Sequence, residues 1–336
     1  MRVRKAMAVV ALVAAASLSA CGTQDEPAGA EVPAPVSAKD LAKVTLRVAD
    51  QKGGSKALLT AAGLLDDVPY TIEWSTFTSG PPLLEAISAG AADIGRVGNT
   101  PPIFAAAARA KIAVVSSSQG SVRGDAILVP ADSPLRSVKD LRGKTIGVAK
   151  GSSAHGQLLL NLRKAGLSTK DVTLSFLQPA DAYGAFRQKQ LDAWAVWDPY
   201  TAQARLAANA RVLADGTGTA NGYTFLAAGT RALSDPGVNT AIRDFVTRHA
   251  KADVWADAHR DEWAAAWAKE TGLEVEVARA AVENGPDLPV PLDDKVIASE
   301  QELADTFTGE GVLPGRVDFA AFVDRRYATD LDKIRG

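Results

Sequence analysis

The sequence is poor in the residues that most often carry chemistry. Among its 336 residues there is one cysteine, Cys21, and there are three histidines, His155, His249 and His259. A single cysteine excludes an internal disulfide. No Gly-x-Ser-x-Gly elbow occurs, and no spacing of histidines and acids resembles a zinc site. The sequence therefore favours a protein that is not an enzyme and that has no cofactor and no metal.

A strong net charge is also missing. Lys and Arg number 37 against 39 Asp and Glu, which gives a formal net charge of -2. The near-neutral charge gives no broad electrostatic field that would favour nucleic acid as a partner. An anionic ligand would therefore have to be held by local geometry. With 47% hydrophobic and 23% charged residues, the composition is that of a globular protein large enough for two compact domains.

The N-terminus has the pattern of an export signal. Arg2, Arg4 and Lys5 precede a short apolar run over residues 6–18, which is too short to span a bilayer permanently. The pattern predicts a signal peptide over residues 1–20.

The apolar run ends in Leu18-Ser19-Ala20-Cys21-Gly22, which resembles a bacterial lipobox. Cys21 would then be lipidated and become the mature N-terminus. The alternatives are an ordinary secretory signal with a chance cysteine, or a lone buried thiol, and position and flanks favour the lipobox. Residues 23–39 are rich in Pro, Ala, Gly and acids, so residues 21–43 are expected to form the lipidated end and a flexible tether.

From residue 44 onward, apolar strands alternate with amphipathic helices. Strands are expected at 44–49, 71–77, 93–97 and 112–116, with helices between them. A second set has strands at 126–130 and 145–149 and a helix at 153–164, and the capping pattern from Ser137 to Asp140 predicts the start of another helix. Strands that alternate with helices indicate an α/β fold with mainly parallel, doubly wound sheets.

A short apolar strand near residue 223 is followed by an almost wholly helical tail from 234 to 331. The two strands at 125–130 and 223–229 are candidate hinges. The expected division is a first lobe from 44–124 and 230–336 and a second lobe from 131–222. Periodicity alone supports only two α/β units.

Four turns place a Gly- or Ser-rich segment between a strand and a helix, at residues 51–55, 78–82, 98–102 and 150–155. Free backbone N–H groups and the positive end of a helix dipole favour anions at such turns, and ligands settle at this edge of α/β sheets. Each turn alone is equally well explained by helix capping. The Gly-Ser-Ser-Ala-His string lacks the ending of a P-loop, so nucleotide binding is not expected.

The string from Leu191 to Tyr200 reads as a buried strand that ends in an acid and aromatic rings. Trp194 sits in the middle of the strand and is expected in the core, whereas Trp197, Asp198 and Tyr200 are expected to reach a cleft.

The histidines and the other tryptophans are less informative. His155, near a helix start, is either a ligand contact or a bystander, and His249 and His259 are most simply solvated. Core packing is expected for the tryptophans at helical spacing in the tail, Trp255, Trp263 and Trp267.

These strings resemble those of the aliphatic sulfonate-binding proteins of ABC importers, within the wider nitrate, sulfonate and taurine group. The likeness runs in order from about residue 44 to 229. It is carried by Gln51-Lys52-Gly53, Pro82-Leu83-Leu84-Glu85-Ala86, Pro101-Pro102-Ile103-Phe104-Ala105, Ile127-Leu128-Val129, Lys150-Gly151-Ser152-Ser153, Pro179-Ala180-Asp181-Ala182 and Asp192-Ala193-Trp194 through Tyr200.

The resemblance implies a type II periplasmic-binding fold, in which two lobes joined by two hinge strands close on a sulfonate and a monomer delivers it to an ABC permease with its ATPase subunit. The helical tail would pack on the first lobe. Carried over position by position, the expected ligand-binding residues are Gln51, Ser79, Gly80, Asn99, Thr100, Ser152, Ser153, His155, Trp197, Asp198 and Tyr200.

One position departs from the family pattern. Many members carry an acid where this chain has Asn99, which changes the charge of the cleft. Aliphatic sulfonate is the expected ligand, and taurine, nitrate and sulfate esters stay as alternatives. Two further classes stay open, an enzyme on the same fold and a surface adhesin or sensor subunit. The export signal and the lack of a nucleophile or metal cluster count against the enzyme.

Overall fold

The computed structural model describes residues 32–335, whose strands form two separate sheets. The predicted signal peptide, Cys21 and the start of the tether lie outside these residues. Ordered chain begins before residue 44, because α1 (Ala38–Leu41) is helical and the Val36 N–H donates to Thr240 Oγ1 at 3.2 Å. In residues 32–335 no helix combines the length and the apolar composition needed to cross a membrane.

The first sheet has six strands. In spatial order they are β11 (Leu288–Val290), β4 (Ile112–Gln119), β10 (Tyr223–Gly229), β3 (Ile94–Gly98), β1 (Thr45–Gln51) and β2 (Thr71–Phe77). β1 pairs in parallel with β2 and β3, as the alternation of strands and helices predicts. β10 runs antiparallel to β3 and β4, and β11 antiparallel to β4, so the sheet is mixed.

Helices cover this sheet from two parts of the chain. α2 (Ser55–Ala61), α3 (Gly80–Ser88) and α4 (Thr100–Ala107) follow β1, β2 and β3 directly. The tail supplies α8 (Thr230–Ser234), α9 (Pro236–Ala258), α10 (Arg260–Thr271), α11 (Val275–Val282), α12 (Asp294–Gly309), η3 (Phe319–Phe322) and α13 (Ala328–Arg335).

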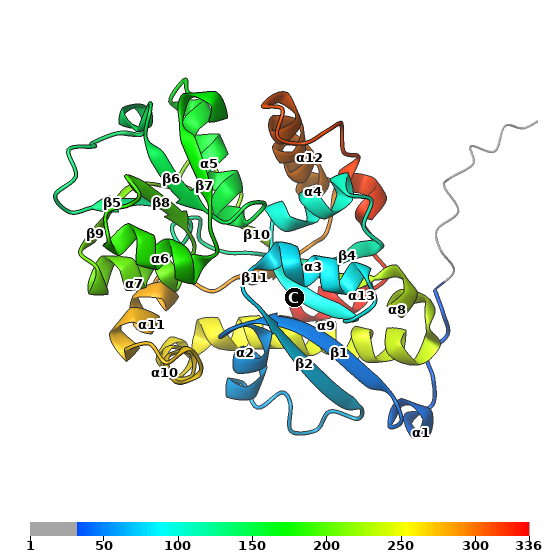
Figure 1. Ribbon diagram of the computed structural model, residues 1–336. Helices are drawn as coiled ribbons and strands as arrows, with labels where there is room; N and C mark the ends of the chain where they lie inside the picture. The colour runs from blue at the N-terminus through cyan, green and yellow to red at the C-terminus, as the bar shows by residue number, and fades with distance from the viewer. Residues whose placement is uncertain (1–31, 336) are drawn as a thin grey trace, which may run out of the picture. The chain divides into compact units, whose positions relative to one another are not determined.

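The tail shares a core with the first sheet. Ile242 and Phe245 of α9 are fully buried in one cluster with Leu46 of β1 and Ile94 of β3. Each fully buried aliphatic side chain of this kind contributes about 1.5 to 3 kcal/mol. Farther along, α11 contacts a helix of the second sheet, and α12 lies beside α4 (Figure 1).

The second sheet has five strands in the order β7 (Thr173–Phe176), β6 (Thr145–Val148), β8 (Ala193–Val196), β5 (Ala126–Pro130) and β9 (Ala210–Asp215). It is also mixed, since β6 is parallel to β7 and β8 while β5 is antiparallel to β8 and β9. Its helical segments are η1 (Val138–Leu141), α5 (Ser153–Lys164), η2 (Thr169–Asp171), α6 (Pro179–Arg187) and α7 (Tyr200–Ala207).

One expected helix is only a short 3-10 turn. The capping box forms as the sequence predicts, since the Ser137 N–H donates to Asp140 Oδ2 at 2.9 Å. The helical turn nevertheless ends at Leu141, because Arg142 is non-helical and Gly143 adopts a positive φ of 72°. A good cap alone does not sustain a helix whose later residues leave the helical region.

The chain crosses between the sheets twice, over residues 120–125 and 216–222. The crossings run side by side: the Gly120 N–H donates to the Gly222 carbonyl and the Gly216 N–H to the Val122 carbonyl, both at 3.0 Å. Of the expected hinge strands, 125–130 and 223–229, all residues but Asp125 form β5 and β10 within the sheets. The lobe bounds given above stay a prediction.

Candidate functional site

A cavity of about 530 Å³ lies where the two sheets face each other. On one side it is lined by the turns that follow β1, β2 and β3, and on the other by the turns that follow β6 and β8. These turns come at the carboxyl ends of their strands, the edge at which α/β sheets bind ligands. The sequence predicted this edge as the binding edge.

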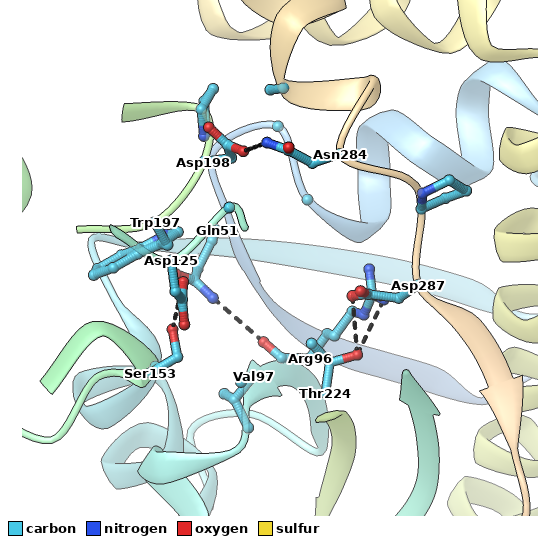
Figure 2. Close-up of a pocket in the computed structure, with 18 of the residues that line it drawn as sticks. Gln51, Arg96, Val97, Asp125, Ser153, Trp197, Asp198, Thr224, Asn284 and Asp287 are labelled. Atoms are coloured by element: carbon cyan, nitrogen blue, oxygen red, sulfur yellow. Dashed lines mark hydrogen bonds and ion pairs between the residues drawn. The ribbon is translucent and has the colours of Figure 1, made fainter. Parts of the chain in front are cut away.

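Eight of the eleven expected ligand-binding residues line the cavity. They are Gln51, Gly80, Asn99, Ser152, Ser153, Trp197, Asp198 and Tyr200. Figure 2 labels Gln51, Ser153, Trp197 and Asp198 among them. The other three expected residues, Ser79, Thr100 and His155, are buried beside the cavity and do not line it.

Each of the three buried residues is surrounded by other groups of the protein. Ser79 is the N-cap of α3, and its side chain makes no capping bond. Thr100 Oγ1 donates to Asn99 Oδ1 at 3.0 Å. His155 packs among the rings of Phe104 and Phe307, with centroids 5.9 and 5.2 Å away. Burial lowers the pKa of His155 to about 4, so its ring is neutral near pH 7.

The starts of α4 and α5 meet at one end of the cavity. A Cβ placed on Gly156 would lie 2.3 Å from Thr100 Oγ1, and one on Gly98 would lie 2.9 Å from Ser153 Cβ. Contacts this short require glycine at both positions. The two helix N-termini therefore approach the cavity from opposite sheets.

These helix starts give the cavity its capacity for anions. The first N–H groups of a helix have no partner within the helix, and its dipole favours negative charge there. In α3 and α4, however, proline occupies two early positions, Pro81 and Pro82 in one and Pro101 and Pro102 in the other. Because proline has no N–H, α5 offers the fuller set of donors.

Asn99 belongs to a chain of amides that leads away from the cavity. Its Nδ2 donates to Asn221 Oδ1 at 2.8 Å, and Asn221 Nδ2 donates to Glu300 Oε1 at 2.8 Å. Glu300 in α12 is fully buried. Burial raises the pKa of Glu300 to about 8, against the hydrogen bond from Asn221, which lowers it.

Arg96 in β3 is the main charged group that the sequence analysis missed. Its Nη2 lies 2.7 Å from Asp287 Oδ2, 3.6 Å from Asp253 Oδ1 and 3.2 Å from Thr224 Oγ1. An arginine inside an otherwise apolar strand was the available signal. Its partners could not be foreseen, since they lie more than 120 residues away in the sequence.

Behind Arg96, Ser55, His249 and Asp253 form a buried row. His249 Nε2 lies 3.1 Å from Ser55 Oγ, and its Nδ1 lies 3.4 Å from Asp253 Oδ2. The expectation that His249 is solvated is wrong, because α9 buries it against the first sheet. His259, at the end of α9, is exposed as expected.

The row has the residue types of a Ser-His-Asp triad but not its surroundings. The side chain of Ser55 is 1% exposed. The Ser55 and Lys56 N–H groups, which would have to stabilise an oxyanion, donate instead to the carboxylate of Asp50 at 2.8 and 2.9 Å. An oxyanion beside that carboxylate would be repelled, so the geometry favours binding over acyl transfer.

The tail adds further cavity residues. Trp263 and Trp267, expected only in the core, line the cavity and stack on each other at 5.3 Å. Asn284 follows α11, and its Nδ2 donates to Asp198 Oδ2 at 2.6 Å (Figure 2). This bond links the tail to the second sheet across the cavity.

Comparison with known proteins agrees with this geometry. The family model for the periplasmic substrate-binding protein of phosphonate ABC transporters matches residues 60–271. The chain is 36% identical over 278 residues to the putative aliphatic sulfonates-binding protein of Escherichia coli (strain K12), with 81% of this chain and 86% of that protein covered. It is 31% identical over 285 residues to the protein of the same description in Bacillus subtilis (strain 168), covering 84% and 83%.

A solved structure shows the same architecture. The alkanesulfonate-binding protein SsuA from Xanthomonas axonopodis pv. citri, bound to MOPS, superposes with a TM-score of 0.77 at 36% identity, covering 84% of this chain and 98% of that chain. Sequence, fold and cavity thus agree over most of the described residues. The chain belongs to the periplasmic substrate-binding proteins of ABC transporters, in the family of the aliphatic sulfonate-binding proteins.

Proposed function

We propose that the protein captures an aliphatic sulfonate in the cavity between its two sheets and delivers it to an ABC permease for sulfur uptake. The observation that carries the proposal is the convergence of the α3, α4 and α5 starts on one cavity, with Gly80, Asn99 and Ser153 on its wall. Backbone N–H groups at helix starts suit the oxygens of a sulfonate. The names of the relatives agree with this ligand class.

Delivery requires that the ligand favour one arrangement of the two sheets. A ligand shifts the equilibrium between two arrangements only to the extent that it binds one of them more tightly than the other. The Asp198–Asn284 hydrogen bond and the contact between α4 and α5 both join the sheets around the cavity. We propose that a bound sulfonate stabilises these contacts and that the permease docks on the resulting form.

The substrate is tested by ligand-induced thermal stabilisation. Alkanesulfonates, nitrate, sulfate and sulfate esters are compared in one buffer on the soluble protein from residue 32. A ligand at about 100 times its Kd adds about 2.7 kcal/mol, which is expected to shift Tm by a few degrees. If nitrate or sulfate stabilises the protein and no sulfonate does, the assignment of a sulfonate substrate is wrong, whereas the binding role stands.

The membrane anchor is part of the same proposal. Family membership implies an extracytoplasmic location, and we propose that Cys21 is lipidated and holds the protein at the cell membrane. Changing Cys21 to alanine is expected to move the protein from the detergent-extracted membrane fraction to the soluble fraction. Unchanged partitioning of the variant would contradict a lipid anchor at this cysteine.

A further inference from the structure

The charged groups on the cavity wall are not balanced. The carboxylates are Asp50, Asp125, Asp198, Asp253 and Asp287, and the cations are Lys52 and Arg96. Three of the carboxylates have a cation or the N–H groups of a helix start as partner. Asp50 accepts the backbone N–H groups of the α2 start, and Asp253 and Asp287 lie against Arg96.

Asp125 and Asp198 are the two that remain, and both belong to the side of the second sheet (Figure 2). Asp125 Oδ1 accepts a hydrogen bond from Ser153 Oγ at 3.3 Å. Asp198 accepts bonds from Asn284 Nδ2 and the Ala202 N–H, at 2.6 and 3.1 Å. All three donors are neutral. Within residues 32–335, no Lys, Arg or His forms an ion pair with either carboxylate.

The two carboxylates lie close together. A Cβ on Gly124 would be 3.0 Å from Asp198 Oδ2, and Gly124 directly precedes Asp125. Two uncompensated carboxylates on the wall of a sulfonate cavity repel the anion that the cavity is to hold. They attract a cation, and the ring of Trp197 on the same wall also favours positive charge.

We propose that the natural ligand is a zwitterion, a sulfonate that carries an ammonium group, and that Asp125 and Asp198 bind this ammonium. The inference rests on the proposed function, because it identifies the chemical group at the end of the ligand opposite the sulfonate. The sulfonate lies at the starts of α3, α4 and α5, and the ammonium replaces the counter-charge that the two carboxylates lack. Asp125 and Asp198 thereby select among sulfonates.

The pH dependence of binding separates the two kinds of ligand. Burial, together with the charges of Asp198 and Asp287, raises the pKa of Asp125 to about 7, against the hydrogen bond from Ser153. Burial raises the pKa of Asp198 to about 6. Asn284, the Ala202 N–H and the more distant Arg205 oppose the rise at Asp198. An ammonium binds the ionised carboxylates, so its affinity grows as pH rises through 6 to 7. A plain alkanesulfonate binds better when they are protonated, so its affinity falls over the same range.

The test compares 3-aminopropane-1-sulfonate with butane-1-sulfonate, in which a methyl group replaces the ammonium. Isothermal titration calorimetry of the protein at pH 7.5 is expected to show the aminosulfonate binding at least about tenfold more tightly. Asp125→Asn and Asp198→Asn should each reduce this preference severalfold, and the double variant should abolish it. Asp66→Asn, the same charge change at an exposed loop position, serves as the control and should leave the preference intact.

Each outcome decides a different point. Equal or tighter binding of butane-1-sulfonate by the unchanged protein overturns the zwitterion and leaves the proposed function standing. Binding of neither sulfonate contradicts the proposed function itself. A preference for the aminosulfonate that survives the double variant shows that other residues hold the ammonium and overturns the assignment to Asp125 and Asp198. Because the comparison of ligands uses the unchanged protein, it does not depend on the folding of a variant.

Discussion

Replacing Arg96 with methionine is expected to lower the free energy of unfolding by about 3 kcal/mol. Methionine keeps the apolar stem of the side chain and removes its charge. The buried Asp253 and the partly exposed Asp287 would then lose their guanidinium partner, since Arg96 Nη2 lies 3.6 and 2.7 Å from them. Asp253 would keep the His249 ring at 3.4 Å. Urea denaturation measures the loss as a lower midpoint with an unchanged slope.

Arg325→Met provides the matched control for this prediction. Arg325 pairs with Asp294 at the surface, where the two side chains are 44% and 93% exposed. An exposed ion pair contributes about 0 to 1 kcal/mol, so this variant should differ little from the unchanged protein. A similar small loss for both variants would show that the Arg96 cluster does not stabilise the fold.

Replacing Glu300 with glutamine is expected to raise the free energy of unfolding by about 3 to 4 kcal/mol at pH 8, and to change it little at pH 5. Burial raises the pKa of Glu300 to about 8, above its ordinary value of 4.5. The folded protein therefore holds a proton that the unfolded chain releases, so the stability of the unchanged protein falls as pH rises from about 5 to 8. Glutamine cannot lose a proton and does not have this dependence.

Urea denaturation at both pH values tests the Glu300 prediction. Glu302→Gln, an exposed position in the same helix α12, makes the same change of charge and should not alter the pH dependence. A Glu300→Gln curve that falls with pH as steeply as that of the unchanged protein would contradict the prediction. Asn221, which donates to Glu300 at 2.8 Å, finds a carbonyl oxygen in glutamine as well.

The α/β elements were predicted well because each is encoded locally. The strand predicted at 71–77 and the helix predicted at 153–164 have these bounds in β2 and α5. The periplasmic-binding fold, implied by the resemblance, is confirmed by the solved relatives. The antiparallel members of each sheet were not predicted, because strand direction depends on where the chain returns. β11 was missed because three residues, Leu288–Val290, are too few to show a period.

The candidate site was predicted in part for a similar reason. Turns that follow strands can be recognised by their glycine, serine and proline, and five residues from such turns line the cavity, together with three from the aromatic string that ends at Tyr200. The residues contributed by the tail, such as Trp267, Asn284 and Asp287, carry no such local signal. They reach the cavity only because α9 to α11 pack on the first sheet. The burial of His249 was missed for the same reason, because a helix with a polar sequence can still bury a polar residue on the face that packs against the sheet.

The two paired crossings between the sheets have a mechanical consequence. Gly120 and Gly222, and Gly216 and Val122, are joined by backbone hydrogen bonds, and Gln119 Nε2 donates to the Asn221 carbonyl at 2.7 Å. A ribbon of two bonded chains flexes readily out of its own plane and resists sliding of one chain past the other. We therefore expect the two sheets to rotate relative to each other about a single hinge axis. Thermal motion would then open and close the cavity while its two walls keep their alignment.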